Sequence, residues 1–196
     1  MTPVDRTHDS PEAYRVRERR PREVDLIVLH QTGTPRPADL AAPGLDRVKA
    51  HALVLDSGEV RQLHPWLARL RYGSGAWNSR CISVEHRANL PGRYHRGEPR
   101  WWRPDLVPPE AWSADERRAQ VLASRDLLRL LVAELPAVRF IAPHRMVQAG
   151  KGGCCGPDLW REVGEWAIRE LGLALPQPHE GGSALPLIWR GAPKIG

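Results

Sequence analysis

The sequence predicts a single α/β domain in which a mixed central β-sheet is flanked by α-helices. Three short apolar runs, at 25–30, 81–85 and 138–142, are rich in β-forming residues and are typical of buried strands. Two longer segments, 113–135 and 157–172, carry apolar residues at helical spacing and predict helices with one apolar face. Helices that accompany strands in this order pack on the sheet. The length of 196 residues suits one domain with a sizeable core.

A β-hairpin is predicted between the first two of these strands. Residues 51–55 and 59–63 are both of β type, and the tight turn between them carries Gly58. In the next run, alternation with a period of two places Ser83 and Glu85 on the same face of a strand. Glu85 is the last residue of that run, so we expect it at the end of its strand.

Both predicted helices carry boundary signals. Ser113 and Glu116 form a capping box at the start of the long helix, which stops before Pro136. Pro157 stands at the first position of the last helix, and Gly172 follows its last turn.

The remaining segments are predicted to lie around this domain, which spans 23–172. Residues 1–22 are polar, rich in arginine and interrupted by proline, and they predict a poorly ordered N-terminal arm or a short surface helix. Residues 64–80 predict a long loop, and 89–112 predict a surface excursion. Residues 173–196 are rich in proline and glycine and predict a C-terminal extension that wraps the surface or frays.

Composition narrows the classes of function. The net charge is +6, but the basic residues are spread along the chain and not clustered on one element, so we expect no nucleic-acid partner. The chain lacks an apolar run of the roughly 18 residues that a membrane span needs. Its N-terminus lacks the apolar core of a signal peptide, so we expect synthesis in the cytoplasm and export, if any, by another route. We expect a monomer.

Residues of metal-ligand type are spaced so that they meet at the carboxyl-end edge of the sheet. His30 ends the first strand, and His144 lies two residues beyond the strand at 138–142. If these strands are parallel, both imidazoles emerge at the same edge, and the glycine-rich loop after His144 can return a thiolate from Cys154 or Cys155. Two nitrogens and one sulfur leave a fourth position open, which is the pattern of catalytic Zn²⁺.

Four segments, taken in order, resemble those of the zinc-dependent N-acetylmuramoyl-L-alanine amidases. This family shares its fold with the peptidoglycan recognition proteins and the phage lysozyme-amidases. The matching segments are 27–32, 51–60, 77–85 and 143–157, and the resemblance covers roughly 24–171. It implies one Zn²⁺ and hydrolysis of the amide that joins the lactyl group of N-acetylmuramic acid to L-alanine.

The resemblance also implies roles for single residues. The family's third ligand often follows the second histidine by ten residues and precedes a Gly-Pro pair, so the ligands here would be His30, His144 and Cys154, with Cys155 outside the site. Glu85 is the candidate general base for water and acid for the leaving amine. Lys151 is a candidate donor to the oxyanion. The substrate would be muropeptides in the cytoplasm, or peptidoglycan of the cell wall after release or delivery without a signal.

Two other classes of function compete with the amidase. A recognition module would bind muropeptide without cutting it, but such members of the family lack metal ligands that this chain retains. A nucleic-acid binder stabilised by a metal would explain the net charge, but the sequence contains no recognisable reading element.

Several positions depart from the family pattern or have ordinary structural interpretations. Arg71 and Tyr72 stand where many members have His-Ala, and Ala50 stands where many have tyrosine. His51, at a strand start, is expected to be structural. The remaining histidines, which are expected at the surface or in loops, are His8, His64, His86, His95 and His179.

Overall fold

The computed structural model of the protein describes residues 2–32, 48–88, 114–179 and 181–196. Six strands form the central sheet in the order β1-β5-β4-β7-β3-β8, and β2 and β6 form a two-stranded sheet. The strands are β1 (Val4–Asp5), β2 (Arg15–Glu18), β3 (Leu26–Gln31), β4 (Ala52–Val54), β5 (Val60–Gln62), β6 (Ala68–Leu70), β7 (Cys81–His86) and β8 (Phe140–Pro143). The predicted excursion at 89–112 and the cap residue Ser113 lie outside the described residues.

The central sheet is mixed, as predicted. Strand β3 pairs in parallel with β7 on one side and with β8 on the other. Strand β4 is parallel to β7 and antiparallel to β5, which confirms the predicted hairpin. Four of the residues in β3, Leu26 to Leu29, are fully buried, which explains why the strand is a continuous apolar run.

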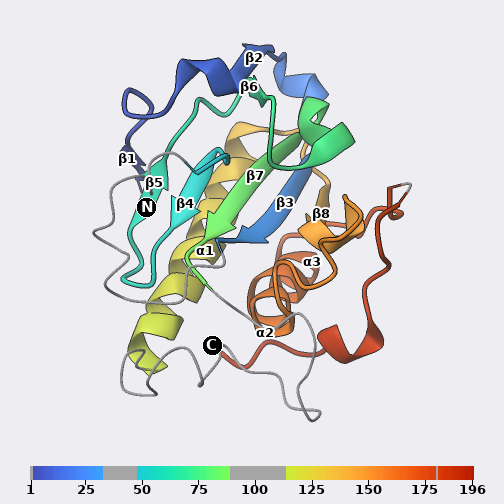
Figure 1. Ribbon diagram of the computed structural model, residues 1–196. Helices are drawn as coiled ribbons and strands as arrows, with labels where there is room; N and C mark the ends of the chain where they lie inside the picture. Colours follow the sequence, from blue (N-terminus) through green and yellow to red (C-terminus); the bar gives the residue numbers. More distant parts are fainter. Residues whose placement is uncertain (1, 33–47, 89–113, 180) are drawn as a thin grey trace.

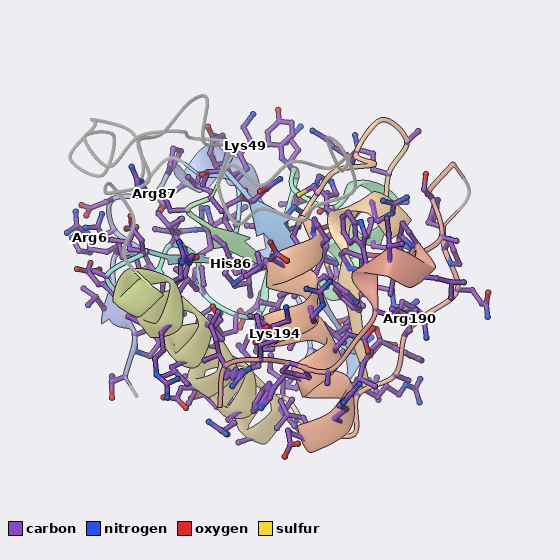
Figure 2. All side chains as sticks on the ribbon, turned by 90° about the horizontal axis from the view of Figure 1, so that it is seen from below. Arg6, Lys49, His86, Arg87, Arg190 and Lys194 are labelled. Atoms are coloured by element: carbon purple, nitrogen blue, oxygen red, sulfur yellow. The ribbon has the colours of Figure 1, made fainter. Side chains whose placement is uncertain are left out.

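The helices pack together on one face of this sheet. Helix α1 (Ala114–Glu134) is followed, after β8, by α2 (Pro157–Leu159), a π-helical segment (Trp160–Glu165) and α3 (Trp166–Glu170). These helices lie on the same side of β3 and β7 (Figure 2), and α1 contacts both the π-helical segment and α3. The predicted helices are therefore confirmed, the second with a π-helical centre.

The opposite face of the sheet has a smaller core and no described long helix. Leu26 and Val28 pack there against Trp77, Met146 and Val147. Trp77 belongs to the 3₁₀ helix Gly75–Ser79. Met146 ends the 3₁₀ helix His144–Met146, and Val147 follows it directly. Because alternate residues of a strand point to opposite faces, His30 emerges on this more open face.

The N-terminal segment, predicted to be a poorly ordered arm or a short surface helix, contains two strands and two short 3₁₀ helices, at Glu12–Tyr14 and Pro21–Glu23. Strand β1 pairs in parallel with β5 at the edge of the central sheet, and β2 pairs antiparallel with β6 (Figure 1). Strand β6 itself lies inside the region predicted to be one long loop. Strand β2 is mostly exposed, so it has no apolar alternation that would mark it in the sequence.

Arg19 anchors this N-terminal segment to the sheet. Its side chain is buried, with 2% exposed, and its guanidinium donates hydrogen bonds to the carbonyl oxygens of Cys81, at 2.7 Å, and Trp66, at 2.9 Å. His51 lies beside it and has the structural role expected: Nδ1 accepts a hydrogen bond from the Ser83 amide, and Nε2 donates one to the carbonyl of Ala68. Carbonyl groups thus satisfy a buried cation for which no carboxylate partner occurs among the described residues.

The C-terminal extension is anchored in the core. Trp189 is 1% exposed and packs in the core cluster under the helices. The carboxylate of Glu162 accepts hydrogen bonds from the backbone amides of Lys194 and Ile195 and from Arg125. Among the described residues, no helix is both long and apolar enough to cross a bilayer.

Two histidines expected at the surface are buried. His64 and His86 are both 0% exposed. His86, which Figure 2 labels between β7 and α1, contacts the carbonyl oxygen of His30 through Nδ1 and the hydroxyl of Ser124 through Nε2, each at 3.0 Å. The expectation was wrong because the partners that bury these rings are distant in sequence.

His51 should make the stability of the protein depend on pH. Burial and the nearby Arg19 lower the pKa of His51 to about 3 in the folded protein, against about 6.5 in an unfolded chain. The unfolded state binds the extra proton between these values, so stability should fall as pH falls through 6.5 toward 3. At pH 5 the loss from this one ring is about 2 kcal/mol.

Urea unfolding of wild type and His51→Gln at pH 7 and pH 5 measures this contribution. The variant should be less stable at pH 7 but lose about 2 kcal/mol less than wild type on acidification. His8→Gln is the control, because the His8 side chain is 73% exposed. Equal losses in wild type and His51→Gln would contradict the assignment.

Candidate functional site

The structure brings His30, His144 and Cys154 together at one edge of the sheet. Strands β3 and β8 are parallel neighbours with Leu29 opposite Pro143, so the next residues, His30 and His144, emerge side by side. Their ring centroids are 4.2 Å apart. The loop after His144 returns Cys154 to this edge, and the three potential ligand atoms lie within 4.8 Å of one another. That grouping can hold a metal ion.

Polar neighbours fix the orientation of each potential ligand. The Nε2 atom of His30 lies 3.1 Å from the Ser74 hydroxyl, which in turn lies 2.9 Å from the hydroxyl of Ser83. This contact leaves Nδ1 of His30 as the nitrogen that can bind a metal. The Nε2 atom of His144 lies 3.3 Å from the Gln148 side-chain oxygen. Partners of this kind hold ligand rings in place and tune their basicity.

Both imidazoles are kept neutral by their surroundings. Burial, and then the neighbouring His144, lowers the pKa of His30 well below its usual value. Burial lowers the pKa of His144 to about 4. Metal ions bind the neutral form of imidazole, so these rings need not lose a proton at neutral pH to become ligands.

The thiol of Cys154 is held in place by the backbone of β3. Its sulfur accepts a hydrogen bond from the amide of Gln31 at 3.4 Å. Burial raises the pKa of this thiol to about 12, and the Glu85 carboxylate acts in the same direction. A divalent cation beside the sulfur would offset that penalty and favour the thiolate.

Glu85 lies on the strand next to His30. Strands β3 and β7 pair with His30 opposite Glu85, and both residues line the same cleft. Burial raises the pKa of the Glu85 carboxyl to about 8, and the Lys151 ammonium opposes that shift. The cleft therefore holds a carboxyl group that can change its protonation state near neutral pH.

The cleft has a volume of about 640 Å³ and runs from the potential ligands along the loop before β7. Lys151 is exposed and lines it, as do residues that the sequence did not predict to belong to the site. Those additional residues are Lys49, Arg71, Tyr72, Asn78 and Gln148. The carboxyl-end edge of the parallel strands thus carries a polar cleft with potential metal ligands at one end.

The model of the N-acetylmuramoyl-L-alanine amidase family matches residues 20–157. This match covers more than half of the chain. The chain belongs to the N-acetylmuramoyl-L-alanine amidase family. The three potential ligands, Glu85 and Lys151 all lie inside the matched region of this amidase-family chain. No curated protein matches it by sequence.

Solved structures of amidases and recognition proteins share the fold. N-acetylmuramoyl-L-alanine amidase LysC from Clostridium intestinale is 14% identical with a TM-score of 0.52, and the match covers 88% of this chain and 100% of LysC. AMPDH3 from Pseudomonas aeruginosa, in complex with anhydromuramic pentapeptide, is 16% identical with a TM-score of 0.52, covering 83% of this chain and 65% of AMPDH3. Drosophila peptidoglycan recognition protein SA is 14% identical with a TM-score of 0.53, and the match covers 91% of this chain and 97% of that protein.

Sequence reasoning missed Ser74 and Gln148, which contact the two imidazoles. A weak signal existed for each. Ser74 lies between Gly73 and Gly75, and Gly73 has φ +110°, where a Cβ atom would lie 2.8 Å from the carbonyl oxygen of Lys49. Gln148 follows His144 by four residues. Neither signal identifies the partner, because both contacts depend on how the strands pair.

Cys154 and Cys155 should differ in their contribution to metal binding. Cys155 is fully buried in the core cluster with Leu159 and Trp160, while Cys154 lines the cleft. Cys154→Ala should therefore weaken Zn²⁺ binding by more than about 100-fold, because losing only a partner of a ligand already costs about 10–100-fold.

Titration of metal-free protein with Zn²⁺ and a competing chelator gives the affinities. Cys155→Ala is the matched control and should bind Zn²⁺ with nearly wild-type affinity, although its unfolding free energy should fall. The reverse pattern would show that the ligand loop is displaced by one residue.

Proposed function

We propose that this chain is a zinc-dependent amidase that hydrolyses the amide between the lactyl group of N-acetylmuramic acid and L-alanine of the stem peptide. One observation carries the proposal. Two neutral imidazoles, a thiol and a carboxyl group converge in one cleft of an amidase-family chain. Its substrates would be peptidoglycan or muropeptides.

Zinc fits the donor atoms of the site. Two imidazole nitrogens and one sulfur match its preference for nitrogen and sulfur ligands, and three protein ligands leave the fourth position open. His30, His144 and Cys154 would hold the ion. When bound, zinc supplies Lewis-acid polarisation of the amide carbonyl and makes a water molecule more acidic.

The side chains of the cleft would perform the remaining steps. Glu85, level with His30 on the adjacent strand, would accept a proton from the attacking water and deliver it to the leaving amine of L-alanine. Lys151, which lines the cleft together with Glu85, would stabilise the negative charge that develops on the carbonyl oxygen. Gln148 and Ser74 would keep the imidazole rings in orientation.

The alternative is a recognition module that binds muropeptide and does not cut it. Its fold would be the same, and the likeness to peptidoglycan recognition protein SA fits it equally well. The presence of Glu85 beside a complete group of two histidines and one cysteine favours the hydrolase, because binding alone requires neither.

Digestion of purified peptidoglycan tests the reaction directly. We expect new free amino groups on L-alanine and intact glycan strands, because the proposed nucleophile attacks an amide. A chelator should stop the release, and added Zn²⁺ should restore it. New reducing ends in place of new amines would point to a glycosidase, and tight binding without either product would support the recognition module.

Glu85→Gln should retain Zn²⁺ and the fold but lose turnover by about 10²–10⁴-fold, because the amide cannot accept the proton. Glu59→Gln is the matched control, since Glu59 is an exposed residue of the β4–β5 hairpin. Rates of L-alanine release from a muropeptide, together with zinc content, measure both effects. A nearly wild-type rate for Glu85→Gln would assign the proton transfer to another group.

A further inference from the structure

Besides Lys151, two cations line the wall of the cleft, Lys49 and Arg71. Both are exposed. Within the described part of the chain, neither forms an ion pair with a carboxylate. Glu85 is the one acidic residue among the described residues that line the cleft, against the three cations Lys49, Arg71 and Lys151. A cleft of this charge attracts anionic ligands.

The backbone that carries Arg71 and Tyr72 is fixed at both ends. The Arg71 amide donates a hydrogen bond to the carbonyl of Tyr14 at 2.8 Å, and the Arg71 carbonyl accepts one from the Asn78 side chain at 3.2 Å. The Asn78 side-chain oxygen also accepts a hydrogen bond from the Ser74 amide at 2.7 Å. Because Ser74 contacts His30, this segment has a defined position relative to the potential metal ligands.

Aromatic rings position Lys49 on this wall. Its ammonium lies 4.3 Å from the centroid of the Tyr72 ring and 5.6 Å from that of Tyr14. The two tyrosines pack edge to face with centroids 5.7 Å apart. Figure 2 shows Lys49 on the side of the strands away from the helices. Tyr14 comes from the N-terminal segment, which precedes the region matched by the family. A cation held over rings is preorganised and remains able to bind an anion.

We propose that Lys49 and Arg71 bind a free carboxylate of the stem peptide and make the site selective for muropeptides whose carboxylates are not amidated. This inference rests on the proposed function and adds the chemical form of its substrate. A stem peptide joined through its N-terminal L-alanine has its carboxylates beyond the amide to be cut. The guanidinium of Arg71 can bind a carboxylate through two parallel hydrogen bonds, and Lys49 contributes a second positive charge.

Two substrates that differ only in charge test the inference. They are N-acetylmuramoyl-L-alanyl-D-glutamate and the same compound with both carboxylates converted to carboxamides. Wild type should prefer the acid by about 10- to 100-fold in kcat/KM, the range of one or two charge-assisted hydrogen bonds. The preference should decline with added salt, because the cations are exposed.

Variants locate the source of this preference. Arg71→Gln and Lys49→Gln should each reduce it, and the double variant should bring it close to 1. Arg129→Gln is the control for total charge, because Arg129 lies on α1 and is 57% exposed, on the other face of the sheet. Tyr14→Ala should reduce the preference without any change in charge, whereas Tyr14→Phe should retain it, because the ring and backbone position Arg71 and Lys49.

Calorimetric measurement of the binding of both compounds, beside their turnover, distinguishes this inference from the proposed hydrolysis. Preferential binding of the acid without turnover would support the carboxylate subsite and overturn the hydrolase. Turnover of both compounds at equal rates would overturn the subsite and leave the hydrolase standing, whereas equal binding of both without turnover would overturn the subsite and the hydrolase. A preference that the double variant retains would also overturn the subsite, and no binding of either compound would overturn both.

Discussion

The parallel pairing of β3 with β7 and β8 is the constraint on which the site depends. It sets His30 level with Glu85 and brings His144 out beside His30. Because side chains alternate along a strand, a shift of one residue in β3 would turn His30 into the helix-covered core and expose Leu29. The apolar residues of β3 are fully buried, so the core that stabilises the fold also fixes this register.

Burial at this edge acts on His30, His144, Cys154 and Glu85 in the direction that removes charge. It lowers the pKa of both imidazoles and raises the pKa of Cys154 and Glu85. Neutral imidazoles suit a metal, but a neutral thiol does not. A divalent ion bound by the sulfur would favour the thiolate, so its binding would release a proton and stabilise the folded state.

The sequence predicted an element correctly wherever the apolar pattern of that segment alone determined its structure. Strands β3, β7 and β8 are buried apolar runs, and the two histidines follow from where those runs end. The pairing of β2 with β6 was missed because β2 is mostly exposed and lacks apolar alternation, and β6 is only three residues long. Arg19 was missed because backbone carbonyls satisfy its guanidinium, and no sequence pattern marks them. The burial of His86 was missed because the ring contacts the hydroxyl of Ser124, which lies on a helix distant in the sequence.

Residues from both ends of the chain contact segments that line or adjoin the cleft. The N-terminal segment supplies Tyr14, which contacts the wall that carries Arg71 and Tyr72. The C-terminal extension acts through Arg145, which follows His144 directly.

The guanidinium of Arg145 stacks over the buried Trp189 ring at 4.8 Å and donates a hydrogen bond to the carbonyl of Gly152. The Arg145 amide also donates a hydrogen bond to the carbonyl of Cys154 at 2.9 Å. Gly150 and Gly152 have no side chains to hold this loop, and among the described residues other than their chain neighbours, no atom lies within 4 Å of the point where either Cβ would be. The position of the Cys154 sulfur therefore depends on contacts made by residues beyond the matched region 20–157, while the ligands themselves lie inside it.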